Sequence, residues 1–372
     1  MEWEAAQIAR HAERELEALV AVSSPSGDRR GAEEAVSLCS ALLPNEAVIE
    51  RIPCSTANYA ADFAARVDGT GKRRILLLGH LDTVVSHDGH RPLERTAGRL
   101  VGSGSIDMKG GVVIAIGVLR ALALQPELFA EATLLLVNDE EWRTGGLAHA
   151  ERFAGMDACL CFEAGQLTPD GEEGVVVKRK AAGTVRVRAH GRQAHSGSAP
   201  HRGRNALLAL ATASQIVAAA HDPHGAERLT AVPTIINAGE AFNVVPGSGE
   251  LFCDLRANEL EAFQRVLGSI PQSHDGVRLE PELVRQWPGM NSRERTGPLL
   301  SDAGERLGRP IVGVERGGAS DASHMAAHVP LTVDGLGPRG GAAHHPDEYV
   351  LEESLEPRAQ VALAIVASLL DR

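Results

Sequence analysis

Three short apolar segments, each followed at once by a histidine or an acidic residue, constrain this chain more than any other feature of its sequence. They are RRILLLG at 73–79, ATLLLVN at 132–138 and DACLCF at 157–162. Apolar runs of this length are typical of strands that are buried on both faces in a parallel sheet. Because open α/β sheets bind ligands beyond the carboxyl ends of their strands, the polar side chains that follow these runs are candidate ligands.

The remaining pattern predicts an α/β fold class with two domains, which suits a length of 372 residues. Helix-period stretches at 2–22, 31–43 and 109–124 alternate with the strands, which favours helices packed on a mostly parallel sheet. From about residue 174, alternating strands such as GTVRVRAHG and GELFCDLRA indicate a small α+β domain with an antiparallel sheet. Helix and strand patterns of the first kind return after about residue 286, so we expect the small domain to be inserted into the large one.

Charge and composition exclude several kinds of partner. The formal net charge is -12 and no basic stripe is present, which argues against nucleic acid. No apolar run approaches the roughly 20 residues of a membrane span. The first residues carry acids where a signal peptide needs positive charge, and the five cysteines are scattered, so we expect a cytoplasmic protein with reduced thiols. Cys159 and Cys161 alternate within a strand pattern, which indicates core packing rather than metal binding.

The first apolar run leads into His80 and Asp82. At a strand end His80 can face the crevice, while Asp82 can accept the second imidazole N–H and fix the tautomer of the ring. Taken alone, a histidine is more often structural. Asp107 lies in GSGSIDMKGG, where glycines allow a tight bend before a helix, and its alternative role is a helix N-cap.

The other two apolar runs also end in acids. Glu140 and Glu141 are adjacent carboxylates, whose repulsion a cation or a raised pKa would relieve; a solvated acidic turn is the alternative. Glu163 ends the third run, and His344 lies in RGGAAHHPDEYV. Together with the residues above, these oxygen and imidazole donors suit zinc, with cobalt or manganese as substitutes. A carboxylate that bridges two ions would hold them about 3.5–4 Å apart.

Taken in order, these segments resemble the zinc metallopeptidases and deacylases that include glutamate carboxypeptidase, aminoacylase, acetylornithine deacetylase and succinyl-diaminopimelate desuccinylase. The resemblance covers nearly the full length and rests on GHLDTV, GSGSIDMKGG, NDEE followed by GG, FEAG, GRQAHSG with GRNA, NVVPGSGELFCDLR, GGASDA and HHPDEYV. Glutamate carboxypeptidase is the closest match among these. The resemblance implies an α/β/α zinc-exopeptidase-like catalytic domain at 1–175 and 286–372, and a ferredoxin-like lid or dimerisation domain at 176–285.

By position, the resemblance implies five ligands for two zinc ions: His80, Asp107, Glu141, Glu163 and His344. Asp107 would bridge the ions, one of which also binds His80 and Glu163. The other would bind Glu141 and His344, which is preferred over His345 because of its spacing from the EYV segment. Glu140 would be the general base that activates a metal-bridging water, and Asp82 would orient His80.

The resemblance also implies roles outside the metal ligands. His195 in GRQAHSG matches a histidine that stabilises the tetrahedral intermediate in the active site of a partner subunit, which implies a homodimer through the lid domain. Arg256 matches the arginine that recognises the substrate carboxylate, with a strand-surface salt bridge as the alternative. We expect Asn243, Gly318 and Ser320 to line the substrate pocket.

The function implied is hydrolysis of the amide bond of an N-acyl amino acid or of a small peptide at its C-terminal residue, with a preference for an acidic side chain such as glutamate. An N-acyl or N-succinyl deacylase of amino-acid biosynthesis would share every catalytic residue. A metal-free binding protein of the same fold is the alternative from another class. A two-metal phosphoesterase is disfavoured by the lack of a phosphate-cradling loop.

Overall fold

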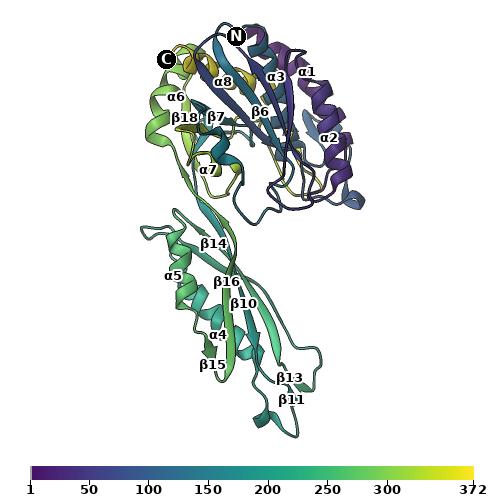
Figure 1. Cartoon of the computed structure of the whole chain (residues 1–372), viewed down its shortest axis with the longest axis vertical. Helices are drawn as coiled ribbons and strands as arrows, with labels where there is room; N and C mark the ends of the chain where they lie inside the picture. Colours follow the sequence, from purple (N-terminus) through teal and green to yellow (C-terminus); the bar gives the residue numbers. More distant parts are fainter. Residues whose placement is uncertain (1) are drawn as a thin grey trace.

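Two bodies make up the structure, a computed structural model that describes residues 2–372 (Figure 1). The larger body contains both chain ends and a central sheet flanked by helices, and the smaller body is an elongated extension. Each has its own apolar core: the core of the extension uses buried residues between Ala181 and Leu279, and that of the larger body draws on residues before and after them. The chain enters the extension after Arg179 and leaves it after Trp287.

The central sheet of the larger body has six strands in the order β1-β2-β6-β3-β7-β19. Their bounds are β1 Val48–Ile52, β2 Asp62–Asp68, β3 Arg73–His80, β6 Phe129–Val137, β7 Ala158–Cys161 and β19 Leu331–Val333. Strand β3 pairs in parallel with β6 and β7, and β7 pairs in parallel with β19. Strand β2 pairs antiparallel with both of its neighbours, β1 and β6. The three apolar runs coincide with β3, β6 and β7, and the sheet confirms the predicted α/β class.

Strand β3 shows why its sequence is apolar without alternation. Ile75 and Leu77 belong to one buried cluster of the body, and Leu76 and Leu78 belong to another. Successive side chains of a strand point to opposite faces of the sheet, so both faces of β3 are covered. All four side chains are fully buried.

Helices cover the two faces of the sheet. Their bounds are α1 Glu2–Ala21, α2 Arg29–Ala41, α3 Gly110–Ala123, α6 Arg293–Leu307, α7 Asp321–Met325 and α8 Leu355–Leu370. On one face α1, α3 and α8 contact one another, and α3 contacts β3 and β6; α7 contacts β3 and β7 as part of the other apolar cluster. Among residues 2–372, no helix has both the length and the apolar character that a bilayer span requires.

Two small sheets complete the larger body. One contains β8 Gln166–Leu167, β9 Glu173–Arg179, β17 Met290–Asn291 and β18 Ile311–Arg316, and the other contains β4 Glu94–Thr96, β5 Arg99–Val101, β20 Gly340–Gly341 and β21 Tyr349–Leu351. Short 3-10 or π turns lie at His87–Gly89, Ser105–Lys109 (η2), Ala150–Phe153 (η3), Pro200–Arg202 and Glu352–Ser354.

The extension is an antiparallel sheet with two helices. The strands are β10 Ala181–His190, β12 Thr230–Ala238, β14 Ser248–Ala257, β15 Ser273–His274 and β16 Val277–Trp287, in the order β12-β14-β10-β16-β15. Helices α4 Ala206–Ala219 and α5 Glu261–Ser269 contact this sheet, and β11 Ala194–His195 pairs with β13 Val244–Val245 at the tip that is far from the larger body (Figure 1). The register places Ala181 opposite Ala257 at the end near the body, and His190 opposite Ser248 at the far end.

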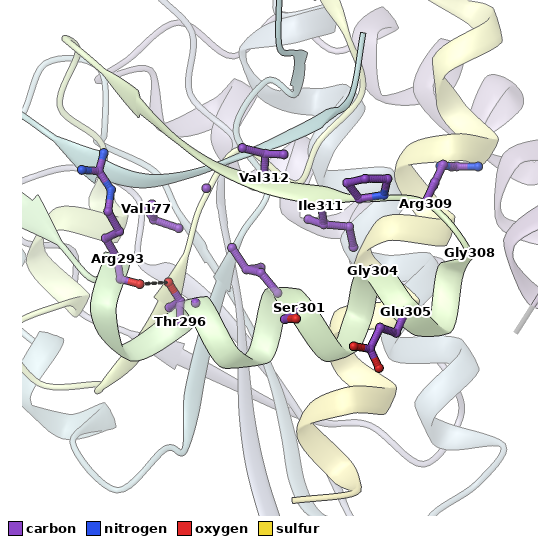
Figure 2. Close-up of a pocket in the computed structure, with 14 residues that line it drawn as sticks. Val177, Arg293, Thr296, Ser301, Gly304, Glu305, Gly308, Arg309, Ile311 and Val312 are labelled. Carbon is purple, nitrogen blue, oxygen red and sulfur yellow. Dashed lines mark hydrogen bonds between the residues drawn. The ribbon is translucent and has the colours of Figure 1, made fainter. Parts of the chain in front are cut away.

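A groove of about 640 Å³ lies between α6 and β18 on the larger body (Figure 2). Arg293 and Arg309 lie toward its two ends, with Thr296 and Ser301 on the helix between them. Several glycines line it, which leaves space that side chains would otherwise fill. Its lining contains none of the candidate metal ligands, which lie at the ends of the parallel strands.

Candidate metal centre

The five candidate ligands come from segments that meet at the carboxyl ends of the parallel strands. His80 is the last residue of β3, Glu141 follows β6, and Glu163 follows β7. Neighbouring parallel strands end at the same edge of a sheet, which is why these three side chains come together. Asp107 comes from η2, immediately before α3, and His344 comes from the loop before β21.

One triple of ligand-type side chains contains His80, Asp107 and Glu163. His80 Nε2 lies 3.2 Å from Asp107 Oδ1 and 3.8 Å from Glu163 Oε1. One ligand atom from each residue lies within 4.8 Å of the others. The imidazole is almost fully buried, so its contacts with carboxylates are shielded from water.

A second triple shares Asp107 and adds Glu141 and His344. His344 Nε2 lies 3.0 Å from Asp107 Oδ2 and 3.3 Å from Glu141 Oε2. Glu141 Oε1 is buried and forms no hydrogen bond. The two oxygens of Asp107 therefore face two different histidines, which is the geometry of a carboxylate that bridges two ions. The triples are the same two sets that the family resemblance implied as ligands.

The candidate metal centre contains more carboxyl groups than imidazoles. Burial raises the pKa of Glu140 and Glu163 to about 8 and that of Glu141 to about 7, because a buried carboxylate ion loses hydration. Hydrogen bonds with Asp107 and Glu141 raise the pKa of His344 to about 10. Burial alone would raise the pKa of Asp107, but hydrogen bonds with the two histidines lower it. Divalent cations can replace the protons of such a cluster, and the donor set fits zinc.

Asp82 has contacts that its sequence position did not indicate. Its carboxylate accepts hydrogen bonds from the backbone amides of Glu140 and Glu141, both at 3.1 Å. His80 Nδ1 lies 3.0 Å from the backbone oxygen of Asp82 and 3.5 Å from its carboxylate. Asp82 therefore connects the end of β3 with the glutamate pair that follows β6.

Glu348, the first residue of the EYV segment, is a positioning residue. Its buried carboxylate accepts hydrogen bonds from the backbone amides of Gly104, Ile106 and Asp107 at 2.8–3.1 Å. These bonds hold the irregular segment that presents Asp107 to both histidines. The acid in HHPDEYV was the available signal, although nothing in the sequence showed which backbone it would bind.

Trp287, at the end of the extension, contacts the loop that contains the glutamate pair. Its indole Nε1 donates a hydrogen bond to Arg143 O at 3.1 Å, and the Arg143 guanidinium lies over the ring at 4.7 Å. Arg285 lies over the same ring at 4.9 Å, and His324 packs edge-on against it. No local pattern in the sequence indicates this cluster, because its members come from three distant segments.

The predicted residues of the extension lie at opposite ends of it. His195 and Asn243 are exposed at the tip, where the backbone oxygen of Asn243 accepts a hydrogen bond from Ser196 N at 3.0 Å. Arg256 lies near the larger body, opposite Ala182, and is paired with Asp254 at 3.0 Å. Within one chain, the structure does not bring His195 to the candidate metal centre (Figure 1).

Gly318 and Ser320 lie before α7 and take part in a buried network. Gly318 O accepts a hydrogen bond from Arg179 Nη1 at 2.8 Å. The Ser320 hydroxyl donates to Asp334 Oδ2 at 2.6 Å, and Arg179 Nε donates to the same oxygen. The hydroxyl of Ser320 is thus used within the fold, whereas the exposed Gly318 remains accessible.

The fold, the two triples of ligand-type side chains and the comparisons with known proteins together define a metallohydrolase that acts on amide bonds. The family model described as Peptidase family M20/M25/M40 matches residues 76–368, and the chain belongs to this family. Carboxypeptidase G2 of Pseudomonas sp. is 27% identical over 95% of this chain and 88% of its own length. Succinyl-diaminopimelate desuccinylase of Rhodospirillum rubrum is 27% identical over 83% of this chain and 87% of its own.

Solved structures share the fold at low sequence identity. The aminopeptidase PepT of Bacillus cereus superposes with a TM-score of 0.78 at 20% identity, covering 98% of this chain and 99% of that one. A metallo-carboxypeptidase of the M20 family from Sulfolobus solfataricus gives a TM-score of 0.74 at 16% identity, covering 97% and 99%. These likenesses extend over both the body and the extension.

Proposed function

We propose that this chain is a dinuclear zinc amidohydrolase that cleaves a C-terminal amino acid, or an acyl group, from a small substrate. One observation carries the proposal: Asp107 directs its two carboxylate oxygens toward His80 and His344, each within a triple of ligand-type side chains. A carboxylate placed in this way can hold two ions about 3.5–4 Å apart. Cobalt and manganese accept the same donors and can substitute for zinc.

Zinc bound by these residues would polarise the substrate carbonyl and acidify water. Glu140 is the acid of the cluster that belongs to neither triple. It lies close enough to His80, Glu163 and Asp107 for their charges to affect its pKa. Its carboxylate takes the proton of the attacking water and passes it to the leaving amine as the C–N bond breaks. Asp82 holds Glu140 in position through the backbone amide.

The substrate is proposed to carry a free carboxylate next to the amide bond. Arg256 offers a planar guanidinium at the end of the extension near the larger body, and its pairing with Asp254 is half-exposed and open to exchange. Carboxypeptidase G2 and succinyl-diaminopimelate desuccinylase both bear names that fit such substrates. We propose glutamate or a similar acidic residue on the carboxylate side of the bond.

The deacylase function is the second candidate, since several of the relatives are named desuccinylases. A substrate panel separates the two: zinc-loaded protein is tested for amine release from N-acetyl, N-succinyl and N-benzoyl amino acids and from dipeptides with different C-terminal residues. Preference for succinyl groups supports the deacylase, and preference for a C-terminal glutamate supports the carboxypeptidase. Metal-loaded protein that cleaves none of them would contradict both and support a binding protein.

We further propose a homodimer formed through the extension. Strand β12 is an edge strand, and it exposes Val232, Ile235 and Ile236, with exposed fractions between 44% and 53%. An unpaired edge with apolar side chains favours pairing with a second copy, commonly by two-fold symmetry. Such a dimer can bring the tip of one subunit, with His195, to the centre of the other. The five free cysteines suit the cytoplasm as the proposed compartment.

Co-expression of two inactive variants tests the action of His195 across subunits. His195→Ala should reduce kcat by about 10²–10³-fold, because a donor to the oxyanion is lost. Heterodimers of His195→Ala with Glu140→Gln should regain activity, since one of the two sites then contains both wild-type residues. With random pairing about half of the dimers are heterodimers, and each of these has one complete site out of two. The mixture should therefore show about a quarter of wild-type activity.

Differently tagged subunits allow the heterodimer to be isolated for this measurement. If His195 acted within its own chain, neither site of the heterodimer would be complete, and activity would stay at the level of the single variants. That result, or a wild-type protein that is monomeric by light scattering while active, would contradict the proposed arrangement.

A further inference from the structure

A second cluster of metal-binding side chains lies one residue before Glu140. Cys54, Asp62 and Asp139 each offer a ligand atom within 4.8 Å of the others. Asp62 begins β2, Asp139 follows β6, and Cys54 lies in the loop between β1 and β2. Because β2 and β6 are antiparallel neighbours, with Phe63 opposite Leu136, the start of β2 lies beside the end of β6. None of these residues belongs to the candidate dinuclear centre.

His149, immediately before η3, lies beside this cluster and contacts Asp62. Its Nε2 lies 3.4 Å from Asp62 Oδ2, and its side chain is only 10% exposed. Both ring nitrogens are buried and form no hydrogen bond, and the same is true of Asp62 Oδ2. A buried polar atom without a hydrogen bond lowers the stability of the fold by about 1–3 kcal/mol, and three such atoms lie together here. Their shared property is that each can bind a metal ion.

The cluster has more negative groups than its surroundings neutralise. Arg143 donates to Asp139 Oδ1 at 2.7 Å, but the same guanidinium also pairs with buried Asp321. Asp62 is fully buried, and its Oδ1 accepts one hydrogen bond, from Asn138 N at 2.9 Å. Burial raises the pKa of Asp62 to about 7 and also raises the pKa of the Cys54 thiol. A divalent cation between these groups would stabilise their charged forms.

We propose that Cys54, Asp62, Asp139 and His149 form a further binding site for a divalent metal ion of the zinc type. A thiolate, an imidazole and two carboxylates supply four ligands, the number found in structural zinc sites. Asp139 Oδ1 accepts one hydrogen bond, from Arg143 Nη1, and retains a lone pair for the ion, because a carboxylate oxygen can accept twice. Binding forms a metal–sulfur bond and releases the thiol proton to solvent, and Asp62 gives up its proton where it holds one.

The position of the site suggests what the ion does. It would connect the β1–β2 loop, the start of β2, the segment that carries the glutamate pair, and the segment before η3. Thr56 already donates two hydrogen bonds to Asp139 Oδ2, at 2.9 Å from its amide and 2.7 Å from its hydroxyl. The ion would therefore fix the backbone that leads into Glu140 and Glu141, and its role is structural rather than catalytic.

Cobalt spectroscopy tests the site, because the dinuclear centre contains no sulfur ligand. Metal-free protein is titrated with Co²⁺, and absorption is followed in the visible and near ultraviolet. We expect a thiolate-to-cobalt charge-transfer band in wild type that is absent from Cys54→Ser. The matched control, Cys253→Ala, changes a cysteine buried in the core of the extension and should keep the band. After zinc loading, Cys54→Ser should hold one ion fewer per chain than wild type.

Saturated wild-type protein without a thiolate band, or a band that survives Cys54→Ser, would overturn the proposal. Alkylation of the wild-type protein provides a test that needs no variant. Cys54 is partly exposed, whereas the other four cysteines are buried. Zinc should slow the reaction of Cys54 with iodoacetamide, measured by peptide mass spectrometry, and an unchanged rate after zinc loading would also contradict the site.

Discussion

Glu140→Gln is expected to lower kcat by about 10²–10⁴-fold while leaving the bound metal in place. The substitution keeps the size of the side chain but removes the group that accepts and returns the proton. Glu140 belongs to neither triple, so the variant should retain as many ions per chain as the wild type, and its thermal stability. Steady-state kinetics and elemental analysis of the same preparation provide the measurement.

The adjacent Glu141→Gln is the matched control. Glu141 Oε2 lies 3.3 Å from His344 Nε2, within the second triple, so this variant should lose metal as well as activity. The two neighbours thus separate a proton-transfer role from a ligand role at nearly the same place. If Glu140→Gln lost an ion, or kept wild-type kcat, the assignment of the base would have to be abandoned.

Asp107→Asn should have the largest effect on metal binding. The change removes the charge of the carboxylate shared by both triples, so we expect both ions to bind more weakly. Loss of several kcal/mol of transition-state stabilisation by metal corresponds to roughly a 10³-fold or greater fall in kcat/KM. Isothermal titration of metal-free protein with zinc, followed by kinetics on the loaded sample, measures both effects.

Glu163→Gln provides the comparison, because Glu163 belongs to only one triple. We expect it to weaken one ion and leave the other bound. Equal zinc affinities in wild type and Asp107→Asn would show that Asp107 does not bridge. A loss of both ions in Glu163→Gln as well would point instead to a general collapse of the site, which circular dichroism would reveal.

The part of the fold that positions the site was predictable because its signals are local. The runs that became β3, β6 and β7 each contain an unbroken apolar stretch, at 75–79, 134–137 and 158–162, as strands covered on both faces require. The chain then places His80 at the end of β3, and Glu141 and Glu163 just beyond β6 and β7, where parallel neighbours end together. Short sequence segments therefore contained both the sheet and most of the candidate ligands.

The remaining features depend on contacts between distant segments. Glu348 accepts a hydrogen bond from Asp107 N across 241 positions of sequence, and no local pattern shows that pairing. The separation of Arg256 from His195 follows from the register of β10 with β14, which is fixed only when the strands pair. The buried contact of Ser320 with Asp334 likewise arises only after α7 packs against the sheet.

Trp287, which is packed among Arg143, Arg285 and His324, lies where β16 rejoins the larger body, at the base of the extension. Strand β16 has 11 residues. At a rise of about 3.3 Å per residue, the ten steps from Val277 to Trp287 span roughly 33 Å. A rotation of the strand by about 10° about the indole would move its opposite end by about 6 Å. A slight repacking of this one ring would therefore displace the far end of the extension by about the length of a side chain.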